Sequence, residues 1–358
     1  MGIAVTGVTK AVLGEPQIAE IMMRAGVTGL GDARVENVER MRAAGLTGPI
    51  TLLRAPMLSQ VKRVVACADA SLNSEIAVIK ALSAAAQSKD CIHGIVLMLE
   101  TGDLREGVMP QHLLSLVEEM LQLPHLQLHG LGTNLACRSG VVPDDANMGE
   151  LSGWVAKIEA AFGLRLARVS GGNSANLDWA FHTKALGRVN ELRLGESILL
   201  GCDPLNRAPI QGLFTDAFTL VAEVIESMQK PSMPWGTLGQ SAFPHALPAK
   251  GQGTRTQSIL ALGHQDTDPW GLTAPLGLEI LGASSDHLVV DSQRFPCTLG
   301  QKVTFQLNYS ALVRAMTSPY VAKSIEDSDF LGLTFSTHEI ASAFSTKALQ
   351  FAQVDRDG

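Results

Sequence analysis

The chain has 358 residues, a formal net charge of −7 and a pI near 5.7. This length allows one large or two ordinary domains, and an apolar content of 46% is enough for a packed core. The acidic balance, with no run of basic residues, argues against a nucleic-acid partner, and no apolar stretch is long enough to span a bilayer. We therefore expect a small-molecule partner and no membrane.

The five cysteines are widely spaced and form neither a C-x-x-C pair nor a zinc-type pattern with histidine. This usage is typical of reduced thiols, and the N-terminus lacks the apolar core of a secretory signal. The expected location is the cytoplasm, and no metal site is predicted.

The first two hundred residues alternate between strand patterns and helix patterns. Short buried strands are expected at residues 5–10, 27–33, 50–54, 70–73, 94–99, 127–132, 164–169 and 191–194. Helices are expected at residues 16–26, 35–44, 59–66, 75–88, 110–121, 149–162 and 177–185. Strict alternation of this kind predicts parallel strands, and eight strands are the number that closes a (β/α)8 TIM-type barrel. An open dinucleotide-binding sheet would need a glycine-rich turn where this chain has Lys10.

From about residue 209 the pattern changes to short β segments without helical spacing, at residues 218–226, 257–263, 278–281, 287–291 and 302–308. The predicted fold class is therefore α/β, with a barrel over residues 1–208 and a mainly β C-terminal domain over residues 209–328. Residues 231–253 are expected to form a loop, and residues 329–358 a weakly patterned tail.

Lys10 is predicted to end the first strand. A lysine at a strand end often only extends into solvent. In a low-dielectric pocket, however, its amine has a lowered pKa and can bond covalently to a carbonyl group or act as a base.

Two further turns fall where a (β/α)8 barrel places its phosphate site, after strands seven and eight. We call them the phosphate turns: residues 170–174, with the sequence S-G-G-N-S, and residues 195–197, G-E-S. Their glycines allow close backbone approach and their polar groups suit a phosphate, although either turn alone could be an ordinary helix cap. Arg193 faces the same side of its strand as Gly195. A lysine, a phosphate site and an arginine between them indicate pyridoxal phosphate.

Several segments resemble the alanine racemase family. They are V-T-K-A at 8–11, T-G-D-L-R-E-G at 101–107, G-T-N at 132–134, S-G-G-N-S at 170–174, R-L-G at 193–195 and S-D-H-L-V-V-D at 285–291. The ornithine and lysine racemase branch is resembled most closely, through V-T-G-V-T-K-A at 5–11, S-L-N-S-E at 71–75, G-T-N-L at 132–135 and M-T-S-P-Y at 316–320. The resemblance implies a pyridoxal phosphate barrel, racemisation of ornithine or lysine, and a head-to-tail homodimer whose partner β domain completes each site.

The resemblance also implies a role for each matched residue. Lys10 would hold the cofactor covalently and act as a base, and Arg105 would place the substrate carboxylate or the cofactor's phenolic oxygen. Arg193 would meet the pyridine nitrogen. Because a guanidinium can only donate, that nitrogen would stay unprotonated, which favours racemisation over decarboxylation. Ser170, Ser174 and Gly195 would bind the phosphate, and the remaining expected cofactor contacts are Asn134, Gly172 and Ser197.

The second acid–base group is where the chain departs from the family. Alanine racemases use a tyrosine in a G-Y-x-D segment of the partner's β domain, and this chain has G-H-Q-D at residues 263–266. His264 is the candidate because histidine has an ordinary pKa of about 6.5, and a surface-loop histidine is the alternative. Ser285 and Asp286 match the partner segment that contacts the substrate carboxylate. A pocket for a cationic side chain could use an acidic residue, and the spacing does not choose among Asp103, Glu106, Asp266 and Asp268.

Three other functions stay open at this point. The chain could racemise alanine, serine or many amino acids; it could bind pyridoxal phosphate without catalysis; or it could be a decarboxylase. The β domain argues against the second function and Arg193 against the third. The family has a helix and a strand before the lysine strand, so we also expect that this chain begins late or is truncated and that its β domain lacks one strand.

Overall fold

The computed structural model describes residues 2–243, 253–325 and 349–351. The chain divides into two compact units, one of which runs to Leu213 while the other begins at Phe214. No helix in these described ranges is long and apolar enough to cross a bilayer.

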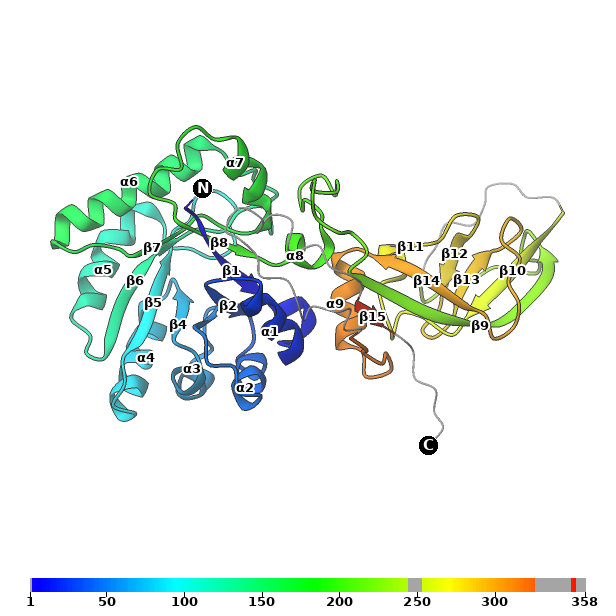
Figure 1. The fold of residues 1–358 in the computed structure, drawn as a ribbon, viewed down its shortest axis with the longest axis horizontal. Coiled ribbons are helices and arrows are strands. Elements are labelled where there is room, and N and C mark those ends of the chain that lie inside the picture. Colours follow the sequence, from blue (N-terminus) through cyan, green and yellow to red (C-terminus); the bar gives the residue numbers. More distant parts are fainter. Residues whose placement is uncertain (1, 244–252, 326–348, 352–358) are drawn as a thin grey trace. The chain divides into compact units, whose positions relative to one another are not determined.

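The first unit is a closed barrel of parallel strands (Figure 1). Its strands are β1 (Ala4–Val8), β2 (Gly29–Asp32), β3 (Ile50–Leu52), β4 (Ala70–Asn73), β5 (His93–Met98), β6 (Leu126–Gly132), β7 (Arg168–Ser170) and β8 (Glu191–Leu194). Strand β1 pairs with both β2 and β8, which closes the barrel. The predicted (β/α)8 fold is therefore confirmed.

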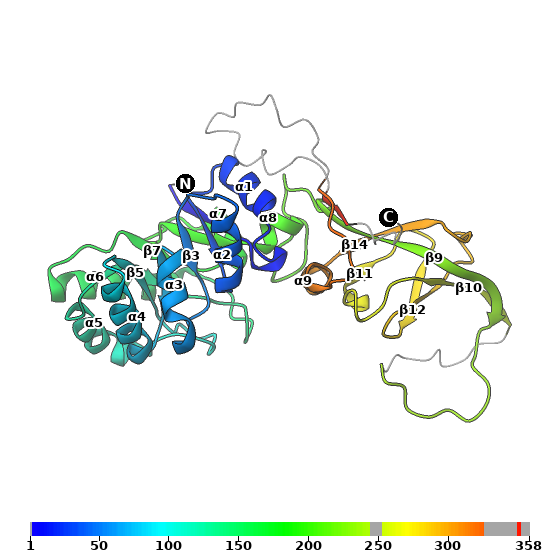
Figure 2. The same ribbon diagram turned by 90° about the horizontal axis from the view of Figure 1, so that it is seen from below.

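Helices lie around the outside of the barrel (Figures 1 and 2). They are α1 (Pro16–Arg24), α2 (Val35–Ala43), α3 (Val61–Cys67), α4 (Ile76–Ser88), α5 (Leu113–Leu121), α6 (Asp145–Phe162), α7 (Leu177–His182) and α8 (Glu196–Leu200). Helix α6 begins four residues earlier than the apolar spacing predicts. The cause is a capping box, in which the Asp144 side chain accepts from the Asn147 N–H and the Asn147 side chain accepts from the Asp144 N–H.

The barrel interior has a polar layer beneath its mouth. Arg168 on β7 donates through Nη1 to Thr51 Oγ1 on β3 at 3.0 Å. Since β3 and β7 lie on opposite sides of an eight-stranded barrel, this bond crosses the interior. Glu191 on β8 accepts from Thr6 Oγ1 at 2.5 Å and lies 3.2 Å from Arg168 Nε. The carboxylate is thereby paired inside the barrel, two residues before Arg193 on the same face of β8.

The second unit is built on a mainly antiparallel sheet in the order β11-β14-β9-β10-β13-β12, which confirms the predicted β domain. The strands are β9 (Phe218–Pro231), β10 (Thr254–Leu260), β11 (Leu272–Thr273), β12 (Glu279–Ala283), β13 (Leu288–Asp291) and β14 (Lys302–Leu307). From the predicted tail, only β15 (Leu349–Phe351) is described, and it pairs with β9 in parallel. The rest of the predicted tail lies outside the described residues.

One helix of the β domain was not predicted. Helix α9 (Tyr309–Thr317) follows β14 directly. It is capped by Asn308, whose side chain accepts from the Ala311 N–H, and its buried residues Ala311, Leu312, Ala315 and Met316 have helical spacing. The Asn cap and this spacing are the signals that the sequence carried.

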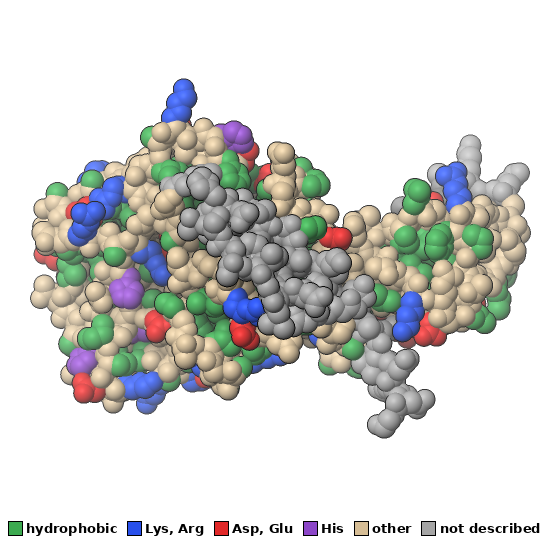
Figure 3. Space-filling view, in the orientation of Figure 1, with side chains coloured by type: hydrophobic (Ala, Val, Ile, Leu, Met, Phe, Trp, Pro, Cys, Tyr) green, Lys and Arg blue, Asp and Glu red, His purple; other side chains and the backbone are tan. Residues whose placement is uncertain are grey.

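Surface charge on the barrel unit is mixed on the side that Figure 3 shows. Lys and Arg side chains are interspersed there with Asp and Glu and do not gather in one stripe. This face therefore lacks the basic patch that phosphate-backbone binding requires.

Candidate active site

Lys10 lies just beyond the first strand. Strand β1 ends at Val8, two residues earlier than predicted, and Lys10 begins the one-turn 3-10 helix η1 (Lys10–Val12). The strand stops because Thr9 leaves the extended conformation, with φ −97° and ψ −1°. Thr9 is fixed there by its Oγ1, which donates to Asp32 Oδ2 at 2.7 Å at the end of β2. The turn therefore places Lys10 at the carboxyl ends of the strands.

The Lys10 amine has a perturbed pKa. The side chain reaches solvent at the open barrel mouth, although protein surrounds it on most sides. This burial lowers the pKa of the amine; the nearby Cys137 thiol opposes the shift, and the positive charges of Arg105 and Arg193 add to it. The neutral, nucleophilic form is thereby favoured.

Arg193 is a buried hub at the barrel mouth, with only 5% of its surface exposed. Its Nη1 donates to Ser170 Oγ, and its Nη2 donates to the Thr133 carbonyl at 2.8 Å and to Asn134 Oδ1 at 3.4 Å. Burial lowers the pKa of the guanidinium, and the charge of Glu191 opposes that shift. Arg193 therefore links the carboxyl ends of β6, β7 and β8.

The two phosphate turns meet at Ser174. Its Oγ accepts from the Gly195 N–H at 3.2 Å, from the Ser197 N–H at 3.2 Å and from Ser197 Oγ at 2.9 Å. Three donors thus converge on one oxygen, as they do around a phosphate oxygen. At Gly172, with φ +145°, a Cβ would lie 2.1 Å from Asn176 Oδ1, so the turn requires glycine.

A side-chain amide at the same mouth has an unused donor. Asn173 Nδ2 donates to Asn134 Oδ1 at 3.1 Å and to Cys137 Sγ at 3.4 Å. Asn134 Nδ2, in contrast, is buried and has no hydrogen-bond partner within the described ranges. A buried donor of this kind normally finds an acceptor. The observation therefore points to a further polar group at this place.

The loops after β5 and β6 are tied together by Asp103, which is only 1% exposed. Its carboxylate accepts from the N–H groups of Cys137, Arg138 and Ser139 at 3.2, 2.9 and 3.0 Å. Burial by itself would raise the pKa of this carboxyl, but the backbone N–H bonds outweigh it and hold the pKa below its usual range. Asp103 is one of the four acidic residues considered for binding a cationic side chain, and its carboxylate is instead bonded to backbone N–H groups.

Cys137 is a site residue that the sequence analysis missed. Its thiol is exposed, lies within hydrogen-bonding reach of the Arg105 guanidinium and interacts electrostatically with Lys10. The available signal was its place in the loop after β6, three residues beyond Asn134. The thiol therefore lies beside two basic groups at the barrel mouth.

The β-domain candidates form a separate cluster. The His264 N–H donates to the Ser284 carbonyl at 3.0 Å and the Gln265 N–H to the Ser285 carbonyl at 2.9 Å, which places His264 beside Ser285 and Asp286. The His264 ring stacks on Phe243 with centroids 4.2 Å apart. Burial, followed by the charge of Arg314, lowers the pKa of His264. The neutral form of the imidazole is thereby favoured.

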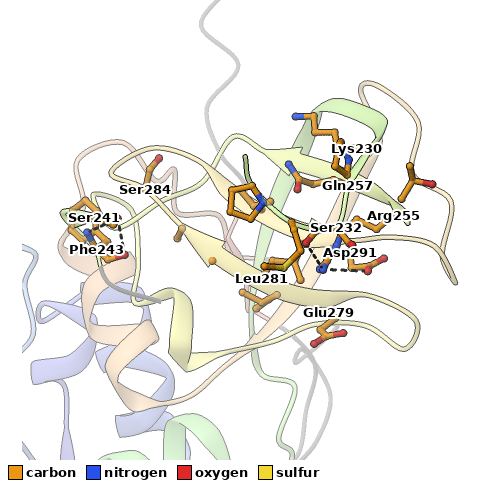
Figure 4. Close-up of a pocket in the computed structure, with 18 of the residues that line it drawn as sticks. Lys230, Ser232, Ser241, Phe243, Arg255, Gln257, Glu279, Leu281, Ser284 and Asp291 are labelled. Carbon is orange, nitrogen blue, oxygen red and sulfur yellow. Dashed lines mark hydrogen bonds and ion pairs between the residues drawn. The ribbon is translucent and has the colours of Figure 1, made fainter. Parts of the chain in front are cut away.

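This cluster borders a hollow of about 1080 Å³ within the β domain. Figure 4 shows Ser241, Phe243 and Ser284 toward one end, with Lys230, Arg255 and Asp291 toward the other. Arg255 donates to the Ser232 carbonyl at 3.0 Å and lies 3.9 Å from Asp291. The end with Phe243 is thus the one that adjoins His264.

Comparison with known proteins decides the family. Residues 2–204 match the model of the family described as alanine racemase, N-terminal domain. The chain belongs to the alanine racemase family. The predicted resemblance is confirmed, and the mouth of this racemase-family barrel is where the lysine, both arginines and both phosphate turns come together.

Two relatives align along most of this alanine racemase family member. It is 38% identical over 329 residues to a lysine racemase of Thermotoga maritima, covering 91% of this chain and 92% of that protein. It is 35% identical over 323 residues to an ornithine racemase of Acetoanaerobium sticklandii, covering 89% and 91%.

Solved structures agree on the fold. An alanine racemase from Clostridium difficile 630 matches with a TM-score of 0.68 and 18% identity over 87% of each chain. A D-threonine aldolase from Filomicrobium marinum matches with a TM-score of 0.69 and 17% identity, over 89% of this chain and 83% of that one. At such identities the likeness establishes only the barrel with its β domain.

Proposed function

We propose that this chain is a pyridoxal phosphate-dependent racemase of ornithine or lysine. The observation that carries the proposal is its identity of 38% to a lysine racemase and 35% to an ornithine racemase along about nine-tenths of its length. The barrel mouth supports it, because a lysine with a lowered pKa, two arginines and a converging set of donors lie together there.

The residues present fit the cofactor. The donors that converge on Ser174 suit its phosphate, and the unused Nδ2 of Asn134 suits a polar group of its ring. We assign covalent attachment to Lys10, and phosphate binding to Gly172, Ser174, Gly195 and Ser197. Arg193 would donate to the ring nitrogen, and Ser170, which accepts from Arg193, would orient that guanidinium. When bound, pyridoxal phosphate withdraws electrons from the amino acid and so makes its α-proton acidic.

Racemisation then needs one proton-transfer group on each face of the amino acid. The neutral Lys10 amine would remove or return the α-proton on one face. His264, Ser285 and Asp286 would come from the β domain of a partner in a head-to-tail homodimer, with His264 serving the other face. The lowered pKa of His264 supports this role, because a neutral imidazole can accept a proton.

The substrate is tested with the purified protein, pyridoxal phosphate and L-ornithine, L-lysine, L-alanine or L-serine, followed by chiral chromatography. We expect D-ornithine or D-lysine to form fastest, and none to form with Lys10→Ala. Release of carbon dioxide would favour a decarboxylase, and faster conversion of alanine or serine would overturn the substrate assignment.

The two proton-transfer groups are separated by the same reaction in deuterated water. We expect His264→Ala to slow α-deuterium incorporation from one enantiomer more than from the other, because each base serves one face. Equal slowing for both enantiomers, or no slowing, would remove His264 from the mechanism.

A further inference from the structure

Arg105 is held by its own neighbour in the chain. Its Nε donates to Glu106 Oε2, and its Nη2 donates to Glu106 Oε1 at 2.5 Å. A guanidinium has two edges that can bind a carboxylate through two parallel bonds, the Nε–Nη2 edge and the Nη1–Nη2 edge. Glu106 occupies the first, so Nη1 and the second N–H of Nη2 point away from it.

The backbone that carries this pair forms a closed loop. The loop from Leu99 to Val108 is closed by two bonds, from the Glu100 N–H to the Val108 carbonyl at 3.0 Å and from the Val108 N–H to the Met98 carbonyl at 2.7 Å. At Gly107, with φ +158°, a Cβ would lie 2.5 Å from the Glu100 nitrogen, so the closure requires glycine. The loop that carries Arg105 is therefore held at both of its ends.

The Arg105 side chain is not fixed by packing, because 39% of it is exposed. Besides Glu106, the Cys137 thiol lies within hydrogen-bonding reach of its guanidinium. An exposed arginine has many rotamers, and ordering it to meet a ligand costs conformational entropy at each binding event. The Glu106 carboxylate selects one orientation before a ligand arrives. It also raises the pKa of Arg105, so the guanidinium stays charged.

We propose that Glu106 is a positioning residue, which holds the Nε–Nη2 edge of Arg105 so that the Nη1–Nη2 edge receives the carboxylate of the amino acid substrate. This inference rests on the proposed function, in which Arg105 places that carboxylate. The opposite arrangement would have Glu106 occupy the carboxylate's own place, as a competitor that the substrate displaces. When the Glu106 charge is removed, the first arrangement predicts weaker binding of the amino acid substrate and the second predicts tighter binding.

The test compares Glu106→Gln and Glu106→Asp with the wild-type holoenzyme. Each is titrated with the substrate amino acid and with the matching diamine, which has the same side chain and amine but no carboxylate, and binding is followed through the cofactor's absorbance. Glu39→Gln is the matched control, because Glu39 pairs with Arg63 Nε and Nη2 in the same way, at 2.8 and 2.6 Å, on the outer helices.

We expect Glu106→Gln to weaken amino acid binding and to raise KM by about 10-fold or more. The dissociation constant for the diamine should stay within about 2-fold of the wild-type value, and the absorbance spectrum of the bound cofactor should not change. Glu106→Asp should recover part of the loss, and Glu39→Gln should change nothing. Equal weakening of both ligands, no change in either, or tighter amino acid binding would each overturn the proposal. A wild-type holoenzyme that binds both ligands but does not racemise would instead overturn the proposed function.

Discussion

Replacing Asp103 with asparagine should release the loop that carries Cys137. In the structure, Oδ2 of Asp103 accepts from two backbone N–H groups and Oδ1 from a third, all at 2.9–3.2 Å. An asparagine NH₂ in place of either oxygen would face backbone N–H donors, so at least one hydrogen bond is lost. The remaining hydrogen bonds would have a neutral acceptor instead of a charged one. Hydrogen bonds to a charged group contribute roughly 1.5–3 kcal/mol and neutral ones roughly 0.5–1.5. Even at the low end of each range, exchanging three charged bonds for two neutral ones costs about 3 kcal/mol or more.

Hydrogen exchange measures this loss directly. A cost of about 3 kcal/mol raises the opening equilibrium of the loop about 100-fold, so the amides of residues 137–139 should exchange about 100-fold faster in Asp103→Asn. Asp144→Asn is the control, because Asp144 accepts one backbone N–H as a helix cap and asparagine caps equally well. If exchange at residues 137–139 changes by less than about 3-fold, Asp103 does not hold this loop and the account of its carboxylate is refuted.

Three further predictions concern titratable groups. Because burial lowers the Lys10 pKa, covalent attachment of pyridoxal phosphate should have its pH midpoint below that of Nα-acetyllysine, and an equal or higher midpoint would contradict the assigned cause. In protein without added cofactor, iodoacetamide should alkylate the exposed Cys137 before Cys67, because burial raises the pKa of Cys67 to about 11. Added pyridoxal phosphate should slow the alkylation of Cys137, and peptide mass spectrometry measures the extent of alkylation at each cysteine. Burial lowers the pKa of His93 from 6.5 to about 4, so the contribution of His93 to the free energy of unfolding is intact above pH 6.5 and should fall by about 3 kcal/mol as the pH drops to 4. Urea unfolding at several pH values should show that His93→Gln lacks this part of the loss of stability in acid.

The barrel could be predicted from the sequence because its signal is local and repeated. Strand β4 (Ala70–Asn73) and strand β8 (Glu191–Leu194) have the predicted bounds, since short buried strands between polar turns leave little room for error. Elsewhere, hydrogen bonds made by side chains move the ends of helices and strands away from the predicted positions. Asp144 extends α6 by a capping box, and Thr9, bound to Asp32 on the next strand, ends β1 before Lys10. The Thr9–Asp32 bond joins two strands and depends on which residues meet after folding, whereas the capping box is a local signal that apolar spacing alone does not show.

The candidate site divides in the same way. Residues at the carboxyl ends of strands, such as Arg193 and Ser174, follow from the barrel alone, because the fold places those ends together. The contacts of Asp103 with the loop after β6 and of Cys137 with Arg105 do not follow, because they join segments about 35 residues apart through loops without a periodic pattern. The pairing of Arg105 with Glu106 was also missed, although the residues are adjacent, because a sequence does not show which way two long side chains turn.

The role assigned to Lys10 can be tested by finding where the cofactor is attached. The holoenzyme would be reduced with borohydride, which makes a lysine bond to pyridoxal phosphate permanent, then digested and analysed by peptide mass spectrometry. We expect the pyridoxyl group on Lys10 and its loss from that peptide in Lys10→Ala. A pyridoxyl group on a different lysine, or on none, would show that Lys10 does not hold the cofactor.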